Sequence, residues 1–417
     1  MLPFMFMGKI QAFEQEGADY INDRLWSGGI RELVLGDLVL QAGEVTGPAF
    51  APNRDLYPDP TAPAERPTEL AAASATFADA VKAAADKGFD IYHHDWGQFA
   101  WFAPNTCLNN PEQIHYGLAR TRDVKEQFPE TTGFILDGPE YGYEIEPEHR
   151  SDVFKCFCEH CEQKAADLGY DFAAMRAASE RLKGQLSRLS PKAMQGFIAT
   201  QTGPFDAVDL LLQDPDLFDW LRFKTQCIQD YVGAFHSCVK EIDPALKLAC
   251  GPRTSAFAPL TAHNFRRLGE VTDFICPKLY FWQHGIDGLK GTVYRYAKTL
   301  MDLNERVSEP LALDLVFKLF GFKMPGVTTL ETLSEPLNEA FFKETVPGEI
   351  AKMVYRTGEV ERLRPWVGLH HGGVRISTTE LSMLMDAISE SALESFIYWH
   401  YTDMSEEEWQ ILQGYIN

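Results

Sequence analysis

Short apolar runs alternate with segments of helical periodicity over most of this chain. Eight of the runs have the length and the flanking residues of buried strands. They cover residues 4–7, 32–37, 89–92, 133–136, 246–250, 273–280, 366–370 and 395–400. Between them lie segments such as 111–128, whose apolar residues follow a helical spacing. This alternation predicts a parallel sheet with right-handed crossovers, and eight units favour a (β/α)₈ TIM barrel of the α/β class.

Three segments between the expected strands have features of their own. Residues 161–242 are apolar at helical spacing, which predicts a long helical insertion after the fourth strand. The stretch 311–320 follows Ser308-Glu-Pro310, which is typical of a helix start and favours a helix. The proline-rich residues 43–69 predict an irregular, exposed loop. We therefore expect residues 1–417 to form a single catalytic barrel, with residues 161–242 as an insertion within it.

Composition removes several classes of function. The 417 residues are 45% hydrophobic and 24% charged, with a formal net charge of −22. A surface this acidic disfavours nucleic acid and anionic membranes as partners, because both attract basic patches. The chain contains no apolar run of about 18 residues, and residues 1–7 are too short for a secretion signal. We therefore expect a cytoplasmic protein without a membrane partner. The early strands lack a glycine-rich G-x-G-x-x-G turn, which removes the main signal for a dinucleotide-binding fold.

The expected carboxyl ends of the strands are unusually polar and aromatic. In a barrel these ends form one rim, which carries the chemistry. The rim residues are Asp37 after the second strand; His93, His94, Asp95 and Trp96 after the third; Asp137, Glu140 and Tyr141 after the fourth; Arg253 after the fifth; Lys278, Tyr280 and Trp282 after the sixth; His370 and His371 after the seventh; and Trp399 and His400 after the eighth. Aromatic faces pack on the C–H surfaces of a sugar ring, and the polar groups hydrogen-bond its hydroxyls. The rim therefore predicts a carbohydrate ligand.

Two carboxylates follow the fourth strand directly. Asp137 and Glu140 come after the apolar run 133–136. Glycoside hydrolysis uses two carboxyl groups, about 5 Å apart in retaining enzymes and about 6.5–9.5 Å apart in inverting ones. Asp137 and Glu140 are the best pair by position, although the sequence does not supply their separation. The structural alternative is a turn aspartate before Gly138-Pro139 and a solvated loop glutamate.

A cysteine cluster follows the carboxylates. Cys156, Cys158 and Cys161 have C-x-C-x-x-C spacing, and Cys107 lies upstream in another expected loop. Four thiolates form a closed tetrahedral zinc site, so we expect a structural zinc ion. His149 or His160 can replace Cys107 as the fourth ligand. The four other cysteines lie in apolar or helical segments, which is typical of buried thiols.

At these residues the chain resembles the family 42 β-galactosidases. Their strand-four acid/base glutamate lies in Asn-Glu-Tyr-Gly, to which residues 139–142, Pro-Glu-Tyr-Gly, are similar. A C-x-C-x-x-C cluster and an upstream zinc cysteine complete that resemblance over residues 90–165. It implies Glu140 as general acid/base. That family's nucleophile is a glutamate after strand seven, where this chain instead has Val367-Gly-Leu-His-His371.

A second, shorter resemblance is to the family 29 α-L-fucosidases. Residues 93–99, His-His-Asp-Trp-Gly-Gln-Phe, are similar to the strand-three motif of those enzymes. Their strand four ends in an aspartate nucleophile, often followed by glycine, which Asp137-Gly138 resembles. This resemblance implies Asp137 as nucleophile and His93 and His94 as sugar-binding residues.

The leading hypothesis is therefore a retaining glycoside hydrolase with Asp137 as nucleophile and Glu140 as acid/base. If the two cannot flank one bond, Asp95 or Asp37 is the next partner. One alternative is a carbohydrate-binding protein without catalysis, favoured by the missing strand-seven glutamate. Another is a metal-dependent hydrolase that uses the histidine pairs and Asp137. The adjacent positions of His93 and His94 count against it, because neighbouring strand residues point to opposite faces. The helical stretch can also cover a neighbouring subunit, so a homo-oligomer stays open.

Overall fold

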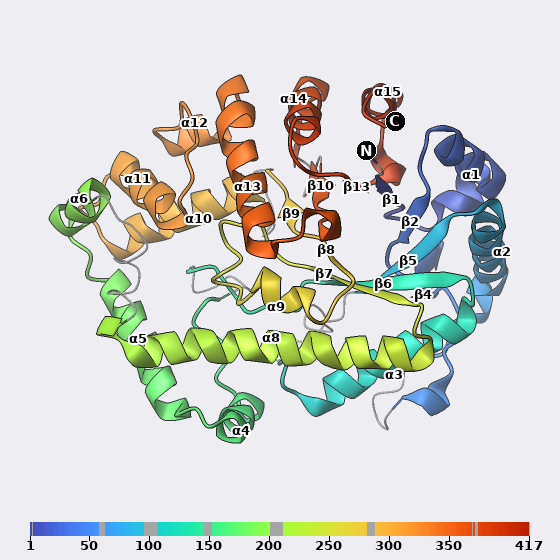
Figure 1. Cartoon of the computed structure of the whole chain (residues 1–417), viewed down its shortest axis with the longest axis horizontal. Coiled ribbons are helices and arrows are strands. Elements are labelled where there is room, and N and C mark those ends of the chain that lie inside the picture. The colour runs from blue at the N-terminus through green and yellow to red at the C-terminus, as the bar shows by residue number, and fades with distance from the viewer. Residues whose placement is uncertain are drawn as a thin grey trace.

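All eight expected strands are present in the computed structural model, and the sixth is divided in two (Figure 1). The structure describes residues 1, 3–57, 63–95, 107–145, 152–200, 212–281, 288–368, 370–371 and 374–416. Parallel pairing joins the strands in the order β8 (Phe274–Ile275), β7 (Lys247–Gly251), β6 (Thr131–Asp137), β5 (Asp90–Asp95), β2 (Glu32–Leu35), β1 (Phe4–Phe6), β13 (Ile397–Trp399), β10 (Trp366–Gly368) and β9 (Lys278–Leu279).

The divided sixth strand closes the sheet into a barrel. On one side, Cys276 N donates to Cys250 O at 2.8 Å and continues the pairing with β7. On the other side, Trp366 N donates to Pro277 O at 2.9 Å and begins the pairing with β10. Pro277 has no N–H, so it interrupts the strand where its pairing changes from one neighbour to the other. The expected α/β barrel is confirmed.

Helices surround the strands as crossovers (Figure 1). They are α1 (Ala18–Ser27), α2 (Ala71–Lys87), α3 (Pro111–Gln127), α8 (Pro215–Ile242), α9 (Phe265–Gly269), α10 (Leu289–Leu303), α11 (Glu309–Phe320), α12 (Leu330–Ser334), α13 (Val346–Thr357), α14 (Thr378–Ser389) and α15 (Glu406–Gln413). The helix favoured after Ser308 is present as α11. Among the described helices, none is long and apolar enough to span a membrane.

The described residues of the stretch 161–242, which are 161–200 and 212–242, are mostly helical, as expected, and fall into two parts. The first part contains α4 (Glu159–Leu168), α5 (Phe172–Leu186) and α6 (Pro191–Ala199). The second part, α8, is the 28-residue crossover that leads to β7, and it begins with Asp214 capping Leu217 N. Figure 1 shows α8 along one side of the molecule, α5 against one end of it, and α6 beside α11. Among the described helices of this stretch, α4–α6 are therefore the ones additional to the barrel helices.

The barrel interior is filled by alternate strand residues, since successive side chains point to opposite faces. The inward set is Phe4, Phe6, Val34, Tyr92, Ile135, Ala249, Phe274, Cys276, Tyr280, Trp366 and Ile397. A second, larger apolar cluster lies between the strands and the helices. Full burial of each large apolar side chain contributes about 1.5–3 kcal/mol, so these two layers hold the rim in place.

Two expectations about local structure are corrected. The loop expected from residue 43 begins inside an antiparallel hairpin of β3 (Val39–Ala42) and β4 (Val45–Pro48). Strand seven ends at Gly368, and the two histidines lie in a separate hairpin of β11 (His370–His371) and β12 (Val374–Arg375). In the first hairpin Gly43, with a φ of +61°, lies at the turn between the two short strands.

Candidate active site

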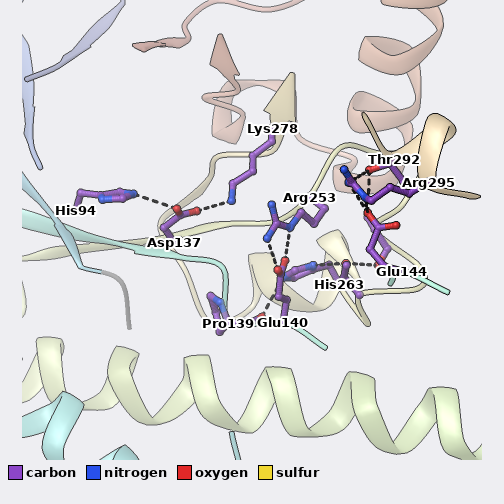
Figure 2. A network of polar contacts seen from close by, with 12 residues as sticks. His94, Asp137, Pro139, Glu140, Glu144, Arg253, His263, Lys278, Thr292 and Arg295 are labelled. Carbon is purple, nitrogen blue, oxygen red and sulfur yellow. Dashed lines mark hydrogen bonds and ion pairs between the residues drawn. The ribbon is translucent and has the colours of Figure 1, made fainter. Parts of the chain in front are cut away.

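Asp137, the last residue of β6, lies inside the barrel between two basic side chains (Figure 2). Lys278 on β9 places Nζ 2.9 Å from Oδ1 of Asp137. His94 on β5 places Nε2 3.3 Å from Oδ2. Asp137 is 8% exposed, and Lys278 is 2% exposed. Three different strands therefore position one buried carboxylate and its partners.

The two partners keep Asp137 ionised. Burial alone would raise the pKa of Asp137, but the positive charge of Lys278 and the hydrogen bond from His94 hold that pKa well below its ordinary value. Burial, followed by the nearby Arg253 charge, lowers the pKa of Lys278. An anionic oxygen fixed in an apolar barrel is suited to attack an electrophilic carbon or to stabilise a developing positive charge.

Glu140 lies three residues further on and has a different partner. Arg253, just after β7, donates from Nε to Oε2 at 2.5 Å and from Nη2 to Oε1. This bidentate pair is buried, with 7% of the Glu140 side chain exposed and 1% of the Arg253 side chain. The Arg253 guanidinium also lies 5.4 Å from the ring centroid of Tyr143. Arg253 therefore occupies both carboxylate oxygens of Glu140, which must leave this pair before it can contact a substrate.

A buried histidine holds the loop that carries both carboxylates. His263 Nε2 lies 3.0 Å from Pro139 O, and its Nδ1 lies 2.6 Å from Thr261 Oγ1. Burial, and then the charges of Arg253 and Lys278, lower the pKa of His263 to about 3, so the ring is neutral. Because a carbonyl only accepts, Nε2 carries the proton toward Pro139 and Nδ1 accepts from the Thr261 hydroxyl. Sequence reasoning missed His263, which lies outside every motif and strand end.

A third carboxylate, Glu144, was also missed. Its Oε1 accepts from Arg295 Nε at 3.0 Å, from Arg295 Nη2 at 2.6 Å and from Thr292 Oγ1 at 3.3 Å (Figure 2). Burial raises its pKa despite the bonds from Arg295. These contacts attach the far end of the loop after β6 to α10, 148 or more positions along the chain, and only the folded structure reveals them.

The four expected cysteines converge. The Sγ atoms of Cys107, Cys156, Cys158 and Cys161 all lie within 4.8 Å of one another. A tetrahedral zinc site with Zn–S bonds of about 2.3 Å separates its sulfur atoms by about 3.8 Å, so this set fits such an ion. Asn109 supports the same conclusion, because it donates from N to Cys107 Sγ and from Nδ2 to Cys161 Sγ, each at 3.4 Å. Such N–H donors stabilise metal-bound thiolates.

Two histidines were considered as alternative ligands, and the described cluster does not include His160. His149 lies outside the described residues. His160 is near Glu159, with 4.0 Å between its Nε2 and Oε1 of that residue. Within the described part of the chain, the cysteines are the one group of His, Cys, Asp and Glu side chains arranged to hold a metal ion.

Tyr141 connects the cysteine cluster to the carboxylates. Asn109 Nδ2 donates to the Tyr141 hydroxyl at 3.3 Å, so one side chain contacts both Tyr141 and a cluster cysteine. Lys224 on α8 lies 5.6 Å from the Tyr141 ring centroid and 3.9 Å from that of Trp220. Burial lowers the pKa of Lys224 to about 7. Tyr141 therefore packs toward the cysteines and α8, as a support for its neighbour Glu140.

An aromatic layer lies next to the Asp137 cluster. Phe6 stacks on Trp399 with 4.6 Å between ring centroids, and it contacts His94 at 5.1 Å and Trp366 at 5.3 Å. Tyr280 reaches Trp399 at 6.1 Å. The structure thus brings the expected residues His94 and Lys278 to Asp137, and the expected residues Tyr280 and Trp399 to the adjoining aromatic layer.

Other expected residues lie elsewhere on the rim or beyond it. Asp37 lines a cavity of about 590 Å³ formed with Gly8, Lys9, Gln11, Ala12, Gln15, Glu16, Val39, Gln41, Gly43, Thr402 and Asp403. His400 lies beside that cavity, with Nε2 3.1 Å from Asp403 Oδ2. Neither Asp137 nor Glu140 lines it, so the cavity and the carboxylates occupy different parts of the rim.

His93 lies on the outer face of β5. It packs against Phe128 and Phe134, and its Nε2 lies 3.0 Å from Thr131 Oγ1. Adjacent strand residues alternate, so His93 and His94 cannot share one ligand or one metal ion. Trp96 and Trp282 lie outside the described residues, as do the side chains of Asp95, His370 and His371.

Solved structures align with this chain at low sequence identity. No protein-family model matches the chain, and no curated protein matches it by sequence. The class V chitinase from Pseudomonas fluorescens Pf-5 aligns with 100% of this chain and 99% of its own, at 10% identity and a TM-score of 0.47. The β-galactosidase from the psychrophilic Marinomonas ef1 aligns with 99% of this chain and 58% of its own, at 10% identity and a TM-score of 0.48.

A GH5_18 protein from Streptomyces cattleya, in complex with Manb1-4GlcNAc, aligns with 100% of this chain and 80% of its own, at 9% identity and a TM-score of 0.46. These structural neighbours are glycoside hydrolases by name, but similarity at this level does not transfer an activity. The resemblances to families 42 and 29 therefore stay predictions.

Proposed function

We propose that this protein is a glycoside hydrolase of the retaining type. Asp137 is the nucleophile, and Glu140 is the general acid/base. The observation that carries the proposal is Asp137 itself, an ionised carboxylate held between Lys278 and His94 inside a barrel. Its place at the carboxyl end of the fourth strand is where barrel enzymes carry their chemistry.

In this proposal each neighbour of Asp137 has a role. Lys278 and His94 keep the carboxylate charged and oriented toward the anomeric carbon of the sugar. The adjoining rings of Phe6, Trp399 and Tyr280 provide an apolar surface beside it. Once substrate displaces it from Arg253, Glu140 takes up a proton from water and gives it to the departing oxygen as Asp137 bonds to the anomeric carbon. Glu140 then accepts a proton from the water that hydrolyses the Asp137–sugar bond, and Arg253 contacts the substrate or the leaving group.

The cysteine cluster has a structural role in the same proposal. A zinc ion held by its four thiolates joins the loop before α3 to the loop after β6. When bound, such an ion supplies a rigid tetrahedral link with no open coordination position. Asn109 and Tyr141 then fix the start of the Glu140 loop.

A second candidate is a carbohydrate-binding protein without catalysis. The observation that favours it is the bidentate ion pair of Glu140 with Arg253, which occupies the proposed proton donor. The absence of a glutamate from residues 366–371 after strand seven points the same way. Binding of sugars without release of product from any glycoside would favour this candidate.

Substitution of Glu140 distinguishes the glycoside hydrolase from the binding protein without catalysis. For Glu140→Gln we expect kcat/KM to fall roughly 10²-fold or more on 4-nitrophenyl or alkyl glycosides, which need protonation of the leaving group. The kcat/KM on 2,4-dinitrophenyl glycosides should be retained, because that leaving group departs unaided, while kcat falls because Glu140 also activates the water of the second step. The measurement is initial rates on both substrate sets, after a screen of common sugars has identified the glycone.

Glu144→Gln provides the matched control, since Glu144 is a buried carboxylate on the same loop that contacts α10. It should affect both substrate sets equally. If Glu140→Gln also lowers both sets by the same factor, Glu140 is not the acid.

A further inference from the structure

Trp366 brings a polar atom into the barrel beside Asp137. It is the first residue of β10, is 1% exposed, and points inward with the apolar interior set. Its ring contacts Phe6, His94 and Trp399, with centroid distances of 5.3, 5.4 and 5.8 Å. Trp366 Nε1 has no hydrogen-bond partner among the described residues. A buried indole N–H ordinarily has one, so this donor is available to a group that enters the site.

Gly251 shows which polar atoms lie near that donor. A Cβ built on Gly251 would lie 3.1 Å from Asp137 Oδ1 and 3.4 Å from Trp366 Nε1. Both polar atoms therefore lie on the side of the β7 backbone toward which a side chain at position 251 would project, and Cys276 O, 3.6 Å from the same Cβ position, adjoins this space. Gly251 is paired with Asp137 in the sheet register, so this space is at the level of the proposed nucleophile.

An acceptor between these atoms matches the chemistry of a sugar hydroxyl. A hydroxyl accepts one hydrogen bond and donates another, so it can accept from Trp366 Nε1–H and donate to Asp137 Oδ1. The aromatic layer of Phe6 and Trp399 adjoins the same space. A simple apolar packing role for residue 366 would not require a polar atom here.

We propose that the Trp366 indole N–H is a substrate-binding donor, which holds a ring hydroxyl of the carbohydrate beside Asp137. This inference rests on the proposed function for the identity of the ligand. It adds a specificity-determining contact from strand seven, the strand on which the sequence offered histidines and no glutamate.

The chain offers a matched control in Trp220. Trp220 on α8 is also buried, at 2% exposed, and its Nε1 has no partner among the described residues. It lies against Phe157 and Lys224, away from the barrel interior. Trp366→Phe and Trp220→Phe remove the same donor and the same ring volume, so they share the cost of a smaller core side chain.

The experiment compares both variants with the wild type by thermal unfolding, by kcat/KM on aryl glycosides, and by the shift in unfolding temperature with methyl glycosides. We expect Trp366→Phe to lose about tenfold in kcat/KM and in methyl-glycoside affinity. Trp220→Phe should stay within twofold of the wild type. Replacement of Trp366 by 3-benzothienylalanine, which keeps the ring volume and exchanges N–H for sulfur, should reproduce the loss without the change in unfolding temperature.

The outcomes separate this inference from the proposed function. Wild-type kinetics in the benzothienylalanine variant would overturn the inference and leave the hydrolase proposal standing. Sugar binding without turnover, weakened by loss of the indole N–H, would overturn the hydrolase proposal and support the inference. A wild-type protein that neither cleaves nor binds any of these probes would overturn both.

Discussion

The segment from Asp137 to Cys161 supplies two clusters that are built in different ways. The carboxylates are held by side chains from barrel strands or the residues just after them, namely His94, Arg253 and Lys278. The cysteines are held together by loops, since Cys107 precedes α3 and Cys156 and Cys158 precede α4. One cluster therefore takes its geometry from the sheet, whereas the other needs a bound ion to define it.

This difference suits the two clusters to different roles, one in catalysis and one in stability. A position fixed by strands suits a group that must meet a reacting atom within a few tenths of an ångström. A cluster fixed by a metal suits a link between loops, and its loss should first be seen in stability. The Asn109–Tyr141 contact is where the two meet, and through it the second cluster supports the first.

Disruption of the cysteine cluster should have the largest effect on stability. We expect the purified protein to contain about one zinc ion per chain, and Cys161→Ser to lose it. Loss of a structural metal should lower the unfolding temperature by roughly 5–10 °C or more. Elemental analysis and thermal unfolding are the measurements.

Cys238→Ser is the matched control for that experiment. Cys238 is buried on α8, outside the cluster, and its Sγ lies 3.7 Å from Leu118 O. The Cys238→Ser variant should keep its zinc ion. A metal-free wild type that is as stable as one purified with zinc would remove the distinction between the two clusters.

The ion pair of Glu140 and Arg253 should have the next largest effect. Arg253→Met leaves a buried carboxylate without its counter-charge, which costs about 3–5 kcal/mol. Glu140→Gln combined with Arg253→Met should recover most of that loss, because the uncompensated charge is gone. Denaturant unfolding of the wild type, the two single variants and the double variant gives the coupling energy.

The exposed pair of Arg122 and Glu241 is the comparison for this cycle, with 38% and 68% of the side chains exposed. Arg122→Met should cost less than about 1 kcal/mol. Equal costs at the two pairs would show that the strand-held cluster does not depend on its charges.

Titration of the buried histidines, His263 among them, should change the free energy of unfolding by a smaller amount. Burial lowers the pKa of His263 and of His93 to about 3, against about 6.5 in the unfolded chain. Between these values the unfolded state binds protons that the folded state does not, so stability falls as the pH decreases from about 6.5. Each histidine contributes at most about 1.4 kcal/mol per pH unit.

Asp137 changes the free energy of unfolding at a lower pH than the histidines do. Its pKa is depressed in the folded protein, so its contribution is present above the unfolded value of about 3.9 and is lost below it. Between pH 4.5 and 6.5 Glu32, whose pKa burial raises to about 7, acts with the opposite sign, so histidine variants are needed to isolate the contribution of each histidine. His93→Gln and His263→Gln should both reduce the slope, and only His263→Gln should lower activity, since only His263 contacts the loop of Glu140. Unchanged slopes would mean that the histidines are protonated in the folded state.

The sequence predicted those parts of the molecule that are set by local patterns. The eight strands, α11, and Asp137 at the end of its strand follow from apolar spacing and flanking residues. The cysteine cluster followed from ligand spacing, although Cys107 lies 49 positions before Cys156. Alternation along β5 also anticipated that His93 and His94 point apart.

The parts that the sequence did not predict depend on long-range pairing. The bidentate contact joins Glu140 to a residue 113 positions away, and Glu144 to Arg295 spans 151 positions. His263 lies on a turn with no motif around it, so only its contact with Pro139 reveals a role. The division of the sixth strand at Pro277 and the hairpin at His370 required the pairing of neighbouring strands to be known.

The most direct test of the account is whether Asp137 forms a covalent bond to the sugar. A 2,4-dinitrophenyl 2-deoxy-2-fluoroglycoside of the identified glycone should release dinitrophenolate as an Asp137 carboxylate oxygen bonds to the anomeric carbon. Peptide mass spectrometry should then find the fluoroglycosyl group on Asp137, and Asp137→Asn should show neither the release nor the label. Turnover of the parent glycoside with the label on Glu140 or on any other residue would contradict the account.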